Sequence, residues 1–375
     1  MPVTVNGAVI SNLVEELAPL ELAEEWDNSG WQLGDPGASV RRVLLALDVD
    51  QDVCREARAR DVQLIVSHHP LFFKGIKQIR LDRPAGVLVA ELLRAGIGVY
   101  AAHTNLDSAR RGVNDVLAAG LELRETAVLK PGGRERYLKL AVFVPADHAE
   151  AVKRTLGDAG AGWIGNYSHC TFAAPGTGTF LPLTGTNPYT GRVGQLAEVA
   201  EVRLETILPA SIAGRVIEAM LAVHPYEEVA YDLYPLANRV KPTAGLGRTG
   251  MLPQALPLAD FAGRVRGILS LPGLRWGGAA NRAVRRVALC GGAGAGLWPE
   301  ALAAGADVLV TGDVGYHAAR DMLAAGMAFI DAGHYGTEKV ILPALRDYLA
   351  QRCREKELPV EFMVSEAQAD PFSFS

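Results

Sequence analysis

The chain has 375 residues, of which 49% are hydrophobic and 21% charged, a mixture typical of a globular protein with a sizeable core. Its length favours two or three domains. A net charge of −5 argues against nucleic-acid binding by bulk charge, because neutralising phosphates needs a basic surface. The four cysteines form no CxxC pair, so neither a zinc ribbon nor a disulfide framework is predicted. We find neither a signal peptide nor a membrane-spanning stretch, and expect a cytoplasmic protein with no membrane partner.

The first 130 residues alternate short apolar runs with helical patterns. Such runs are typical of buried parallel strands, and helices between them favour parallel pairing. The predicted elements are strands at 43–48, 64–67 and 98–102, and helices at 52–60 and 85–95.

The middle of the chain predicts a different order of elements, β-α-β-β-α-β, which is ferredoxin-like. We therefore expect an inserted α+β domain at residues 131–245, joined through Pro131-Gly132-Gly133 and Lys241-Pro242-Thr243. Residues 175–194 are rich in glycine and proline and separate two of its strands. The predicted strands are 138–144, 168–173, 202–208 and 229–236, and the helices are 147–156 and 211–221.

The C-terminal part returns to alternating strands and helices. We expect it to complete one largely parallel α/β sheet with the N-terminal part, in a discontinuous domain of residues 1–130 and 246–375. The predicted strands are 287–290, 308–311, 329–331 and 360–364, and the helices are 299–304, 318–325 and 337–350.

Four of the eight histidines lie in three segments that each follow a predicted strand: IVSHHPLFF, AAHTNLD and DAGHYGTE. Ligands of parallel α/β sheets bind beyond the carboxyl ends of the strands, so these segments could meet in one crevice. His68 and His69 are adjacent, and their side chains diverge in an extended chain. They could each bind one of two neighbouring metal ions. The alternative is a pair of histidines that caps a strand end.

Two further histidines have a carboxylate four residues later: His103 with Asp107, and His334 with Glu338. This spacing places both side chains on one face of a helix, where they could bind metal or simply form a hydrogen-bonded pair. Together with the two adjacent histidines, the pairs favour metal. Imidazole and carboxylate without thiolate suit two divalent ions of Zn, Fe, Mn, Ni or Co. The predicted metal ligands are His68, His69, Asp107, His334 and Glu338.

Three other segments have competing interpretations. Asp313 and His317 are also four residues apart; His317 could be an acid/base beside the metals, or a structural residue of a capped helix. The loop GGAGAG after Cys290 lacks the small residue at 297 that a dinucleotide fingerprint needs, so a Rossmann site is not expected. HPYEE, at 224–228, could bind metal, but a helix end followed by a strand start is favoured.

The chain resembles the GTP cyclohydrolase 1 type 2 family, also called Nif-three-like or dinuclear metal center hexameric proteins. The likeness covers essentially the whole chain and rests on WDNSGWQLG, SHHPLFF, HTNLD, GGAGAG…TGDVGYH and DAGHYGTE. The inserted segment, with HPYEEVAYDLYPL, is similar to the PII/CutA-like middle domain of longer members. Gly336 stands where GHYETE-like motifs have Glu, which removes a carboxylate but no ligand. Trp26 and Trp31 of the first motif are expected to be packing residues rather than a stacking platform.

The resemblance implies a two-metal site with the same five ligands, His103 beside them, and a homo-hexameric ring. We expect a metal-dependent hydrolase of a nucleotide-like substrate, in which His103 or His317 moves protons. The alternative is a non-enzymatic metal-handling or regulatory hexamer whose insert senses a ligand. A third interpretation, a ring that processes nucleic acid, is disfavoured by the acidic net charge.

Overall fold

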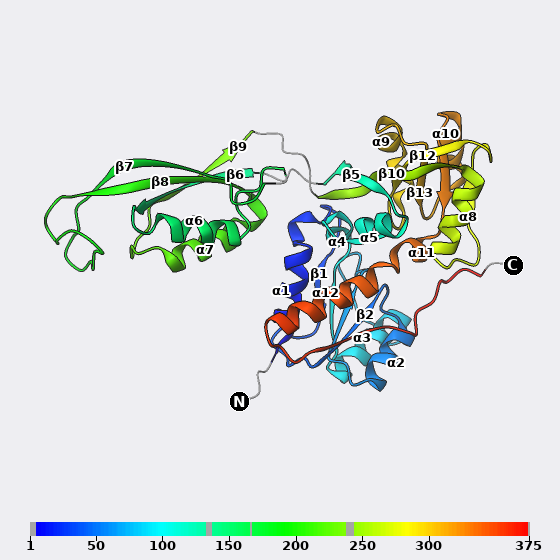
Figure 1. Ribbon diagram of the computed structural model, residues 1–375. Coiled ribbons are helices and arrows are strands. Elements are labelled where there is room, and N and C mark those ends of the chain that lie inside the picture. The colour runs from blue at the N-terminus through cyan, green and yellow to red at the C-terminus, as the bar shows by residue number, and fades with distance from the viewer. Residues whose placement is uncertain (1–4, 133–136, 166, 238–243, 374–375) are drawn as a thin grey trace. The chain divides into compact units, whose positions relative to one another are not determined.

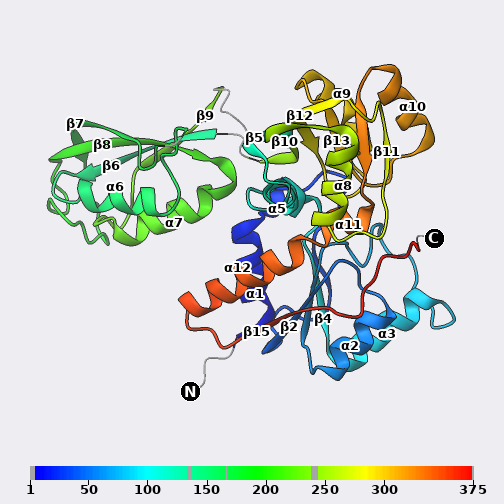
Figure 2. The same ribbon diagram turned by 45° about the vertical axis from the view of Figure 1, so that its right-hand side comes forward.

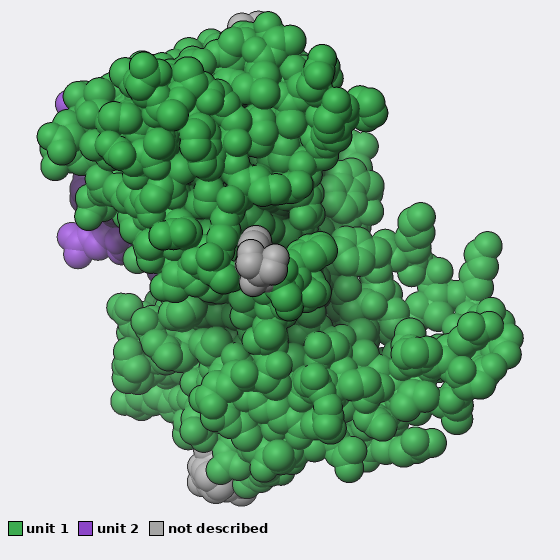
Figure 3. Space-filling model, turned by 90° about the vertical axis from the view of Figure 1, so that its right-hand side faces the viewer, with its two compact units in different colours: residues 1–133, 242–375 green, residues 134–241 purple. Residues whose placement is uncertain are grey.

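A computed structural model of the chain describes residues 5–132, 137–165, 167–237 and 244–373, and it forms two compact units. Unit 1 comprises residues 1–133 and 242–375, and unit 2 comprises residues 134–241 (Figures 1 and 3). Of the predicted joints, Gly133 and Lys241-Pro242-Thr243 lie outside the described residues. No helix in the described part of the chain is both long and apolar enough to cross a bilayer.

Unit 1 contains two sheets, of which the first has the strand order β1-β4-β3-β2-β15. Strands β4, β3, β2 and β15 run parallel, and β1 is antiparallel to β4. The strands are β1 (Gly30–Leu33), β2 (Arg42–Ala46), β3 (Leu64–Ser67), β4 (Gly98–Ala101) and β15 (Glu361–Val364).

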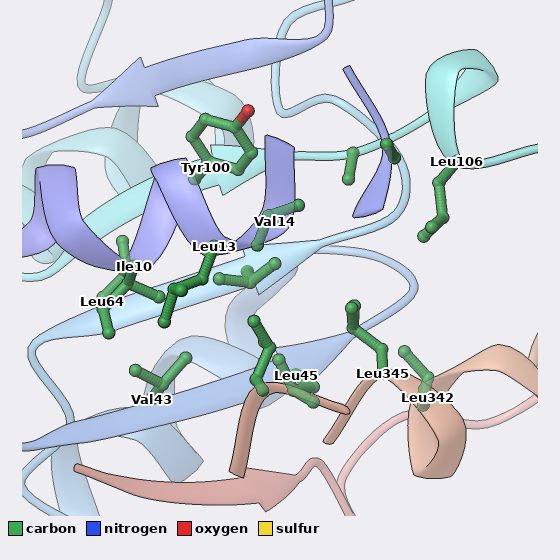
Figure 4. Packing of buried hydrophobic residues seen from close by; sticks show 14 of the residues in the cluster. Ile10, Leu13, Val14, Val43, Leu45, Leu64, Tyr100, Leu106, Leu342 and Leu345 are labelled. Atoms are coloured by element: carbon green, nitrogen blue, oxygen red, sulfur yellow. The ribbon is translucent and has the colours of Figure 1, made fainter. Parts of the chain in front are cut away.

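Helices cover both faces of this first sheet, because its strands are apolar on both sides (Figures 1 and 2). Val43 and Leu45 face the cluster that holds α1 and α12, and Figure 4 shows their packing. Leu44 and Ala46, on the opposite face, pack with α2 and α3. The helices are α1 (Gly7–Leu17), α2 (Gln51–Ala59), α3 (Pro84–Ala95) and α12 (Ile341–Glu355).

The second sheet of unit 1 has the order β11-β14-β13-β12-β10-β5. Its centre, β12 to β14, is parallel, and the outer pairings are antiparallel. One face packs on α5 and α8, and the other on α9 and α10. The elements are β5 (Arg124–Pro131), β10 (Gly245–Pro257), β11 (Arg275–Gly277), β12 (Ala283–Leu289), β13 (Val308–Thr311), β14 (Ala328–Asp331), α5 (Val113–Gly120), α8 (Leu258–Ile268), α9 (Trp298–Ala303) and α10 (Tyr316–Ala324).

The α/β class of unit 1 is confirmed, but the expectation of a single sheet is wrong. Only β15 of the C-terminal part joins the N-terminal strands, next to β2, and the others form the second sheet, which β5 of the N-terminal part joins at its edge. An apolar pattern predicts that a strand is buried and pairs in parallel, but it does not identify the neighbouring strand. The segment predicted as one helix at 337–350 forms two helices instead, α11 (His334–Glu338) and α12. A further short helix, α4 (Thr104–Ser108), follows β4.

Unit 2 has the predicted β-α-β-β-α-β order, with an antiparallel sheet ordered β7-β8-β6-β9. Both helices pack on one face of this sheet. Strand β7 runs through Pro175 and Gly178, in a stretch whose composition suggested a loop. It lies at the sheet edge, where proline is tolerated. The elements are β6 (Tyr137–Pro145), α6 (Ala149–Asp158), β7 (Thr171–Phe180), β8 (Ala197–Pro209), α7 (Ala213–Val223) and β9 (Tyr231–Leu236).

Candidate metal centre

The carboxyl ends of strands from both sheets of unit 1 meet at a cluster of histidines and carboxylates. His68 and His69 follow β3, and His103 follows β4 of the first sheet. His334 begins α11 directly after β14 of the second sheet, and Glu338 ends that helix. The three predicted segments therefore do converge, although they come from two sheets rather than one.

One group of the cluster consists of His68, Asp107 and Glu338. The Nε2 atom of His68 lies 3.7 Å from Oδ1 of Asp107 and 3.6 Å from Oε1 of Glu338. These side chains are almost fully buried, with exposed fractions of 1%, 11% and 4%. The first group is thus a closed set of two carboxylates around one imidazole nitrogen.

A second group consists of His69, His334 and again Glu338. Oε2 of Glu338 lies 3.0 Å from Nε2 of His69 and 3.2 Å from Nε2 of His334. The two imidazole Nε2 atoms are 3.2 Å apart. Glu338 therefore turns one carboxylate oxygen toward each group.

Two buried atoms of the cluster, Nε2 of His68 and Oδ1 of Asp107, have no hydrogen-bond partner among the residues that the structure describes. Leaving a buried polar atom unsatisfied costs about 1–3 kcal/mol. A cation between these two atoms would satisfy both, because each is a ligand atom of the kind that divalent transition metals accept. These side chains could hold a metal ion.

The Nδ1 atom of each histidine in the cluster faces an oxygen outside it. A proton on Nδ1 donates to that oxygen, so the lone pair of Nε2 is left facing the cluster, as in many metal sites. The acceptors lie 2.7–2.8 Å away. The pairs are His68 with the carbonyl of Ala102, His69 with Asp48, His103 with Asp27, and His334 with Asp313.

The sequence patterns did not predict the roles of Asp27 and Asp48. Asp27 stands in a turn and accepts hydrogen bonds from the backbone and hydroxyl of Thr104 besides that of His103. Asp48 follows β2, and its place after a strand of the same sheet is a signal that could have suggested it. Neither aspartate has a helical spacing to its histidine, so the pattern that found the ligands passes over both.

The charges of the cluster raise or lower several pKa values. Burial alone would raise the pKa of Glu338, but the histidines, His68 foremost, outweigh it and hold that pKa well below its usual range. Burial raises the pKa of Asp107 to about 6. Burial would lower the pKa of His69, yet Asp48 and Glu338 raise it to about 10. Glu338 is also the main cause that raises the pKa of His334 to about 9. Without metal, the imidazoles of His69 and His334 therefore bind a second proton at neutral pH.

His103 lies at the side of the cluster, where one of its ring nitrogens is within 4.8 Å of ring nitrogens of His68 and His69. Its ring meets the edges of Trp26 and Phe73, with centroids 6.0 and 5.5 Å away. These two aromatic side chains, which we call the aromatic rim, are 63% and 52% exposed. The expectation that Trp26 is a packing residue is therefore wrong, because this tryptophan lies in solvent beside the cluster.

Other predicted residues take places of their own. Trp31 does pack, edge-on against Tyr100 with ring centroids 5.8 Å apart. His317 is exposed on α10 and is not among the side chains that meet in the cluster; its ring contacts Tyr316. Asp313 has a positive φ of 54° before α10 begins, so it shares no helical face with His317. Its carboxylate instead lies at hydrogen-bond distance from Nδ1 of His334, 2.8 Å away.

The glycine loop after β12 passes directly behind the cluster. Its Gly292 has a φ of 62°, and its backbone N–H donates to the hydroxyl of Thr337 in α11. A Cβ atom at this position would lie within 3.2 Å of Nε2 of His334 and collide with the carboxylate of Glu338. The glycine thus allows the close approach of the loop to the helix that carries two of the candidate ligands.

A family model matches almost the whole chain. The model of the Duf34/NIF3 family (NGG1p interacting factor 3) covers residues 5–371. The chain belongs to this family. A relative from Bacillus subtilis (strain 168), named GTP cyclohydrolase 1 type 2 homolog, is 45% identical over 374 residues and covers 100% of both chains. The resemblance stated from the motifs is confirmed.

Solved structures of this family have the same fold. The crystal structure of a Bacillus cereus protein related to NIF3 matches with a TM-score of 0.91 at 45% identity, over 100% of both chains. The Staphylococcus aureus protein SA1388 matches with a TM-score of 0.74 at 29% identity, over 99% of each chain. The family fold therefore extends over both units.

Proposed function

We propose that unit 1 binds two divalent metal ions through His68, His69, Asp107, His334 and Glu338. The observation that carries this proposal is the position of Glu338, whose two oxygens face two separate groups of ligand atoms. A carboxylate so placed is suited to bridge two ions a few ångströms apart. The donor set of imidazole and carboxylate suits Zn, Fe, Mn, Ni or Co.

We further propose that this centre hydrolyses a nucleotide-like substrate. Bound divalent ions would supply Lewis acidity and a water of lowered pKa. His103 is the residue that we expect to move a proton, because Asp27 holds its Nδ1 and leaves Nε2 facing the cluster. The exposed rings of the aromatic rim could stack on a planar base. The name of the Bacillus subtilis relative also agrees with a guanine nucleotide.

The second candidate is a non-enzymatic, metal-handling or regulatory protein whose unit 2 senses a ligand. It is favoured by the ferredoxin-like unit, which contributes no residue to the metal-ligand groups of the described chain. We propose a homo-hexamer in either case, which analytical ultracentrifugation would test. Tight metal binding without turnover of any nucleotide or phosphoester would decide for the second candidate.

The replacement Glu338→Gln tests the metal centre. We expect it to remove most bound metal and all metal-dependent hydrolysis, because the amide offers one neutral oxygen where the carboxylate offers two charged ones. Metal per chain is measured by elemental mass spectrometry, and hydrolysis with GTP and a panel of phosphoesters. Glu361→Gln is the matched control, since this exposed carboxylate of β15 pairs only with Arg42 at the surface. A Glu338→Gln protein with full metal content would refute the assignment.

A further inference from the structure

Unit 2 contains a cavity of about 730 Å³ that the metal centre does not use. It lies between the β7–β8 hairpin, the loop that follows β7 and the segment before β9, and its lining is mostly apolar. Small-molecule sites typically have volumes of about 300–1,000 Å³ and a few placed polar groups in an apolar wall. The cavity has the size and the character of a ligand site.

One buried carboxylate belongs to the lining of this cavity. Glu201 of β8 is only 9% exposed, and its Oε1 accepts a hydrogen bond from the hydroxyl of Tyr226 at 2.8 Å. Its side chain lies over Gly178 of β7. A Cβ atom added to this glycine would collide with the carboxylate of Glu201, and its three nearest atoms all belong to that side chain. The glycine leaves room for the buried charge.

Aromatic rings surround this carboxylate. The ring of Tyr226 lies 6.1 Å from those of Phe180 and Tyr189, measured between centroids. Burial and the nearby Glu201 raise the pKa of Tyr226, so its hydroxyl stays a donor at neutral pH. Ring faces and a carboxylate in one cavity are the two groups that recognise an organic cation.

The charges of the lining also favour a cation. Glu201, Glu227 and Glu228 line the cavity, and Arg203 is the single cationic side chain among its lining residues. The guanidinium of Arg203 is ion-paired with Glu205, with 3.0 Å between Nε and Oε1, although this Nε makes no well-directed hydrogen bond, and it lies over the ring of Phe143. An anionic ligand would meet three carboxylates and one engaged guanidinium.

The HPYEE segment builds one side of the cavity and shows no sign of binding metal. Nε2 of His224 faces the carbonyl of Phe143 at 3.0 Å, and its Nδ1 accepts a hydrogen bond from the backbone of Tyr226. Both ring nitrogens are therefore committed within the unit. The histidine fixes the turn that places Tyr226 against Glu201.

We propose that this cavity binds a small organic ammonium ion with an apolar or aromatic body, its charge against Glu201 and its body among Phe180, Tyr189 and Tyr226. Burial of Glu201 strengthens the pairing, because little water reaches this carboxylate to screen its charge. The site is independent of the metal centre. It gives unit 2 a binding activity of its own.

The test uses the full-length, metal-loaded protein and phenethylamine as the probe, measured by isothermal titration calorimetry. Two neutral or anionic relatives of the same size, 2-phenylethanol and phenylacetate, isolate the contribution of the charge. We expect saturable binding of phenethylamine, and binding weaker by about tenfold or more for both relatives.

Variants locate the site. Glu201→Gln keeps an acceptor for Tyr226 but removes the charge, and should weaken phenethylamine binding about tenfold. Gly178→Ala displaces the same carboxylate and should do likewise. Glu198→Gln, on the exposed part of β8, is the matched control and should leave binding unchanged. The proposal is overturned if phenethylamine does not saturate, if 2-phenylethanol binds as tightly, or if neither Glu201→Gln nor Gly178→Ala weakens binding more than the control does.

Discussion

Each histidine of the cluster is held at its Nδ1 atom by an oxygen outside the cluster, and this constraint matters at the scale of single residues. The outer oxygens of Asp27, Asp48, Asp313 and the carbonyl of Ala102 orient the rings before any ion arrives. Preorganised ligands lose little side-chain entropy on binding. The metal-free cluster instead carries protons, as the raised pKa values of His69 and His334 indicate.

The apparent metal affinity should therefore rise with pH. The pKa values of about 10 for His69 and about 9 for His334 lie above neutrality, so both imidazoles are protonated in the metal-free protein at pH 7. Metal must displace these protons, and affinity should grow by about tenfold per pH unit for each proton released. Calorimetry of zinc binding between pH 6 and 8, in buffers of different ionisation enthalpy, measures the release. An affinity that stays flat over this range would contradict the protonated state.

The side chains that we propose as ligands could be singled out because most of them leave a mark in the sequence. The adjacent pair His68 and His69, and the i, i+4 spacing of His334 and Glu338, follow from strand and helix geometry. The outer acceptors Asp27 and Asp48 were not predictable in the same way, because their contacts join segments with no fixed spacing. The exposure of Trp26 also depends on tertiary packing that composition does not reveal.

At the scale of elements, the short helix α11 carries much of the site. It is only five residues long, and such a helix gains little stability from its own hydrogen bonds. The glycine loop after β12 holds it through the contact of Gly292 with Thr337. The position of the Glu338 carboxylate thus depends on a loop from a neighbouring strand.

The replacement Gly292→Ala should distort this element. A side chain at φ 62° costs about 1–2 kcal/mol in backbone strain, and its Cβ would displace Glu338. We expect lower stability and loss of most bound metal, measured by thermal unfolding and elemental analysis. Gly296→Ala is the control, since its Cβ would meet nothing within 4 Å. Equal metal content in the two variants would speak against the role of the loop.

Most elements were predictable from apolar periodicity, and the failures have physical reasons. The split of 337–350 into α11 and α12 places a break at residues 339–340, just before Pro343, which lies in the first turn of α12 and has no N–H group to continue a helix from α11. Strand β7 continues through Pro175 because it lies at an edge and needs fewer ladder hydrogen bonds. The composition of a segment gives only its average preference for secondary structure. Whether a strand tolerates a proline depends on the position of that strand in its sheet.

At the scale of the whole molecule, the cluster joins the two sheets of unit 1. Its candidate ligands span residues 68 to 338, so a bound metal would link segments that are distant in sequence. Ion binding to the native state stabilises it by mass action, in proportion to the logarithm of metal concentration over Kd. The partner strands of each sheet were not predictable, because equally apolar strands can pair in several orders.

Chelation should therefore lower the thermal stability of the protein. At a metal concentration about 100 times Kd, the metal-loaded form gains about 2.7 kcal/mol over the metal-free form. Differential scanning calorimetry with zinc and with EDTA measures the difference in Tm. The Tm of Glu338→Gln should hardly change between zinc and EDTA, which distinguishes metal binding at the cluster from a general effect of the additives. An unchanged Tm of the unmodified chain would contradict a structural link through metal.

The pairing of β5 with β10 has a consequence for how this architecture arose. Pro131 and Gly245 face each other in an antiparallel register, immediately before and after unit 2. The chain therefore leaves and re-enters unit 1 at adjacent points, where a plain hairpin would need only a tight turn. Acquiring or losing the whole of unit 2 amounts to exchanging one turn for another. Ancestral chains could have gained it in a single step without redesigning the sheet or disturbing the histidine cluster.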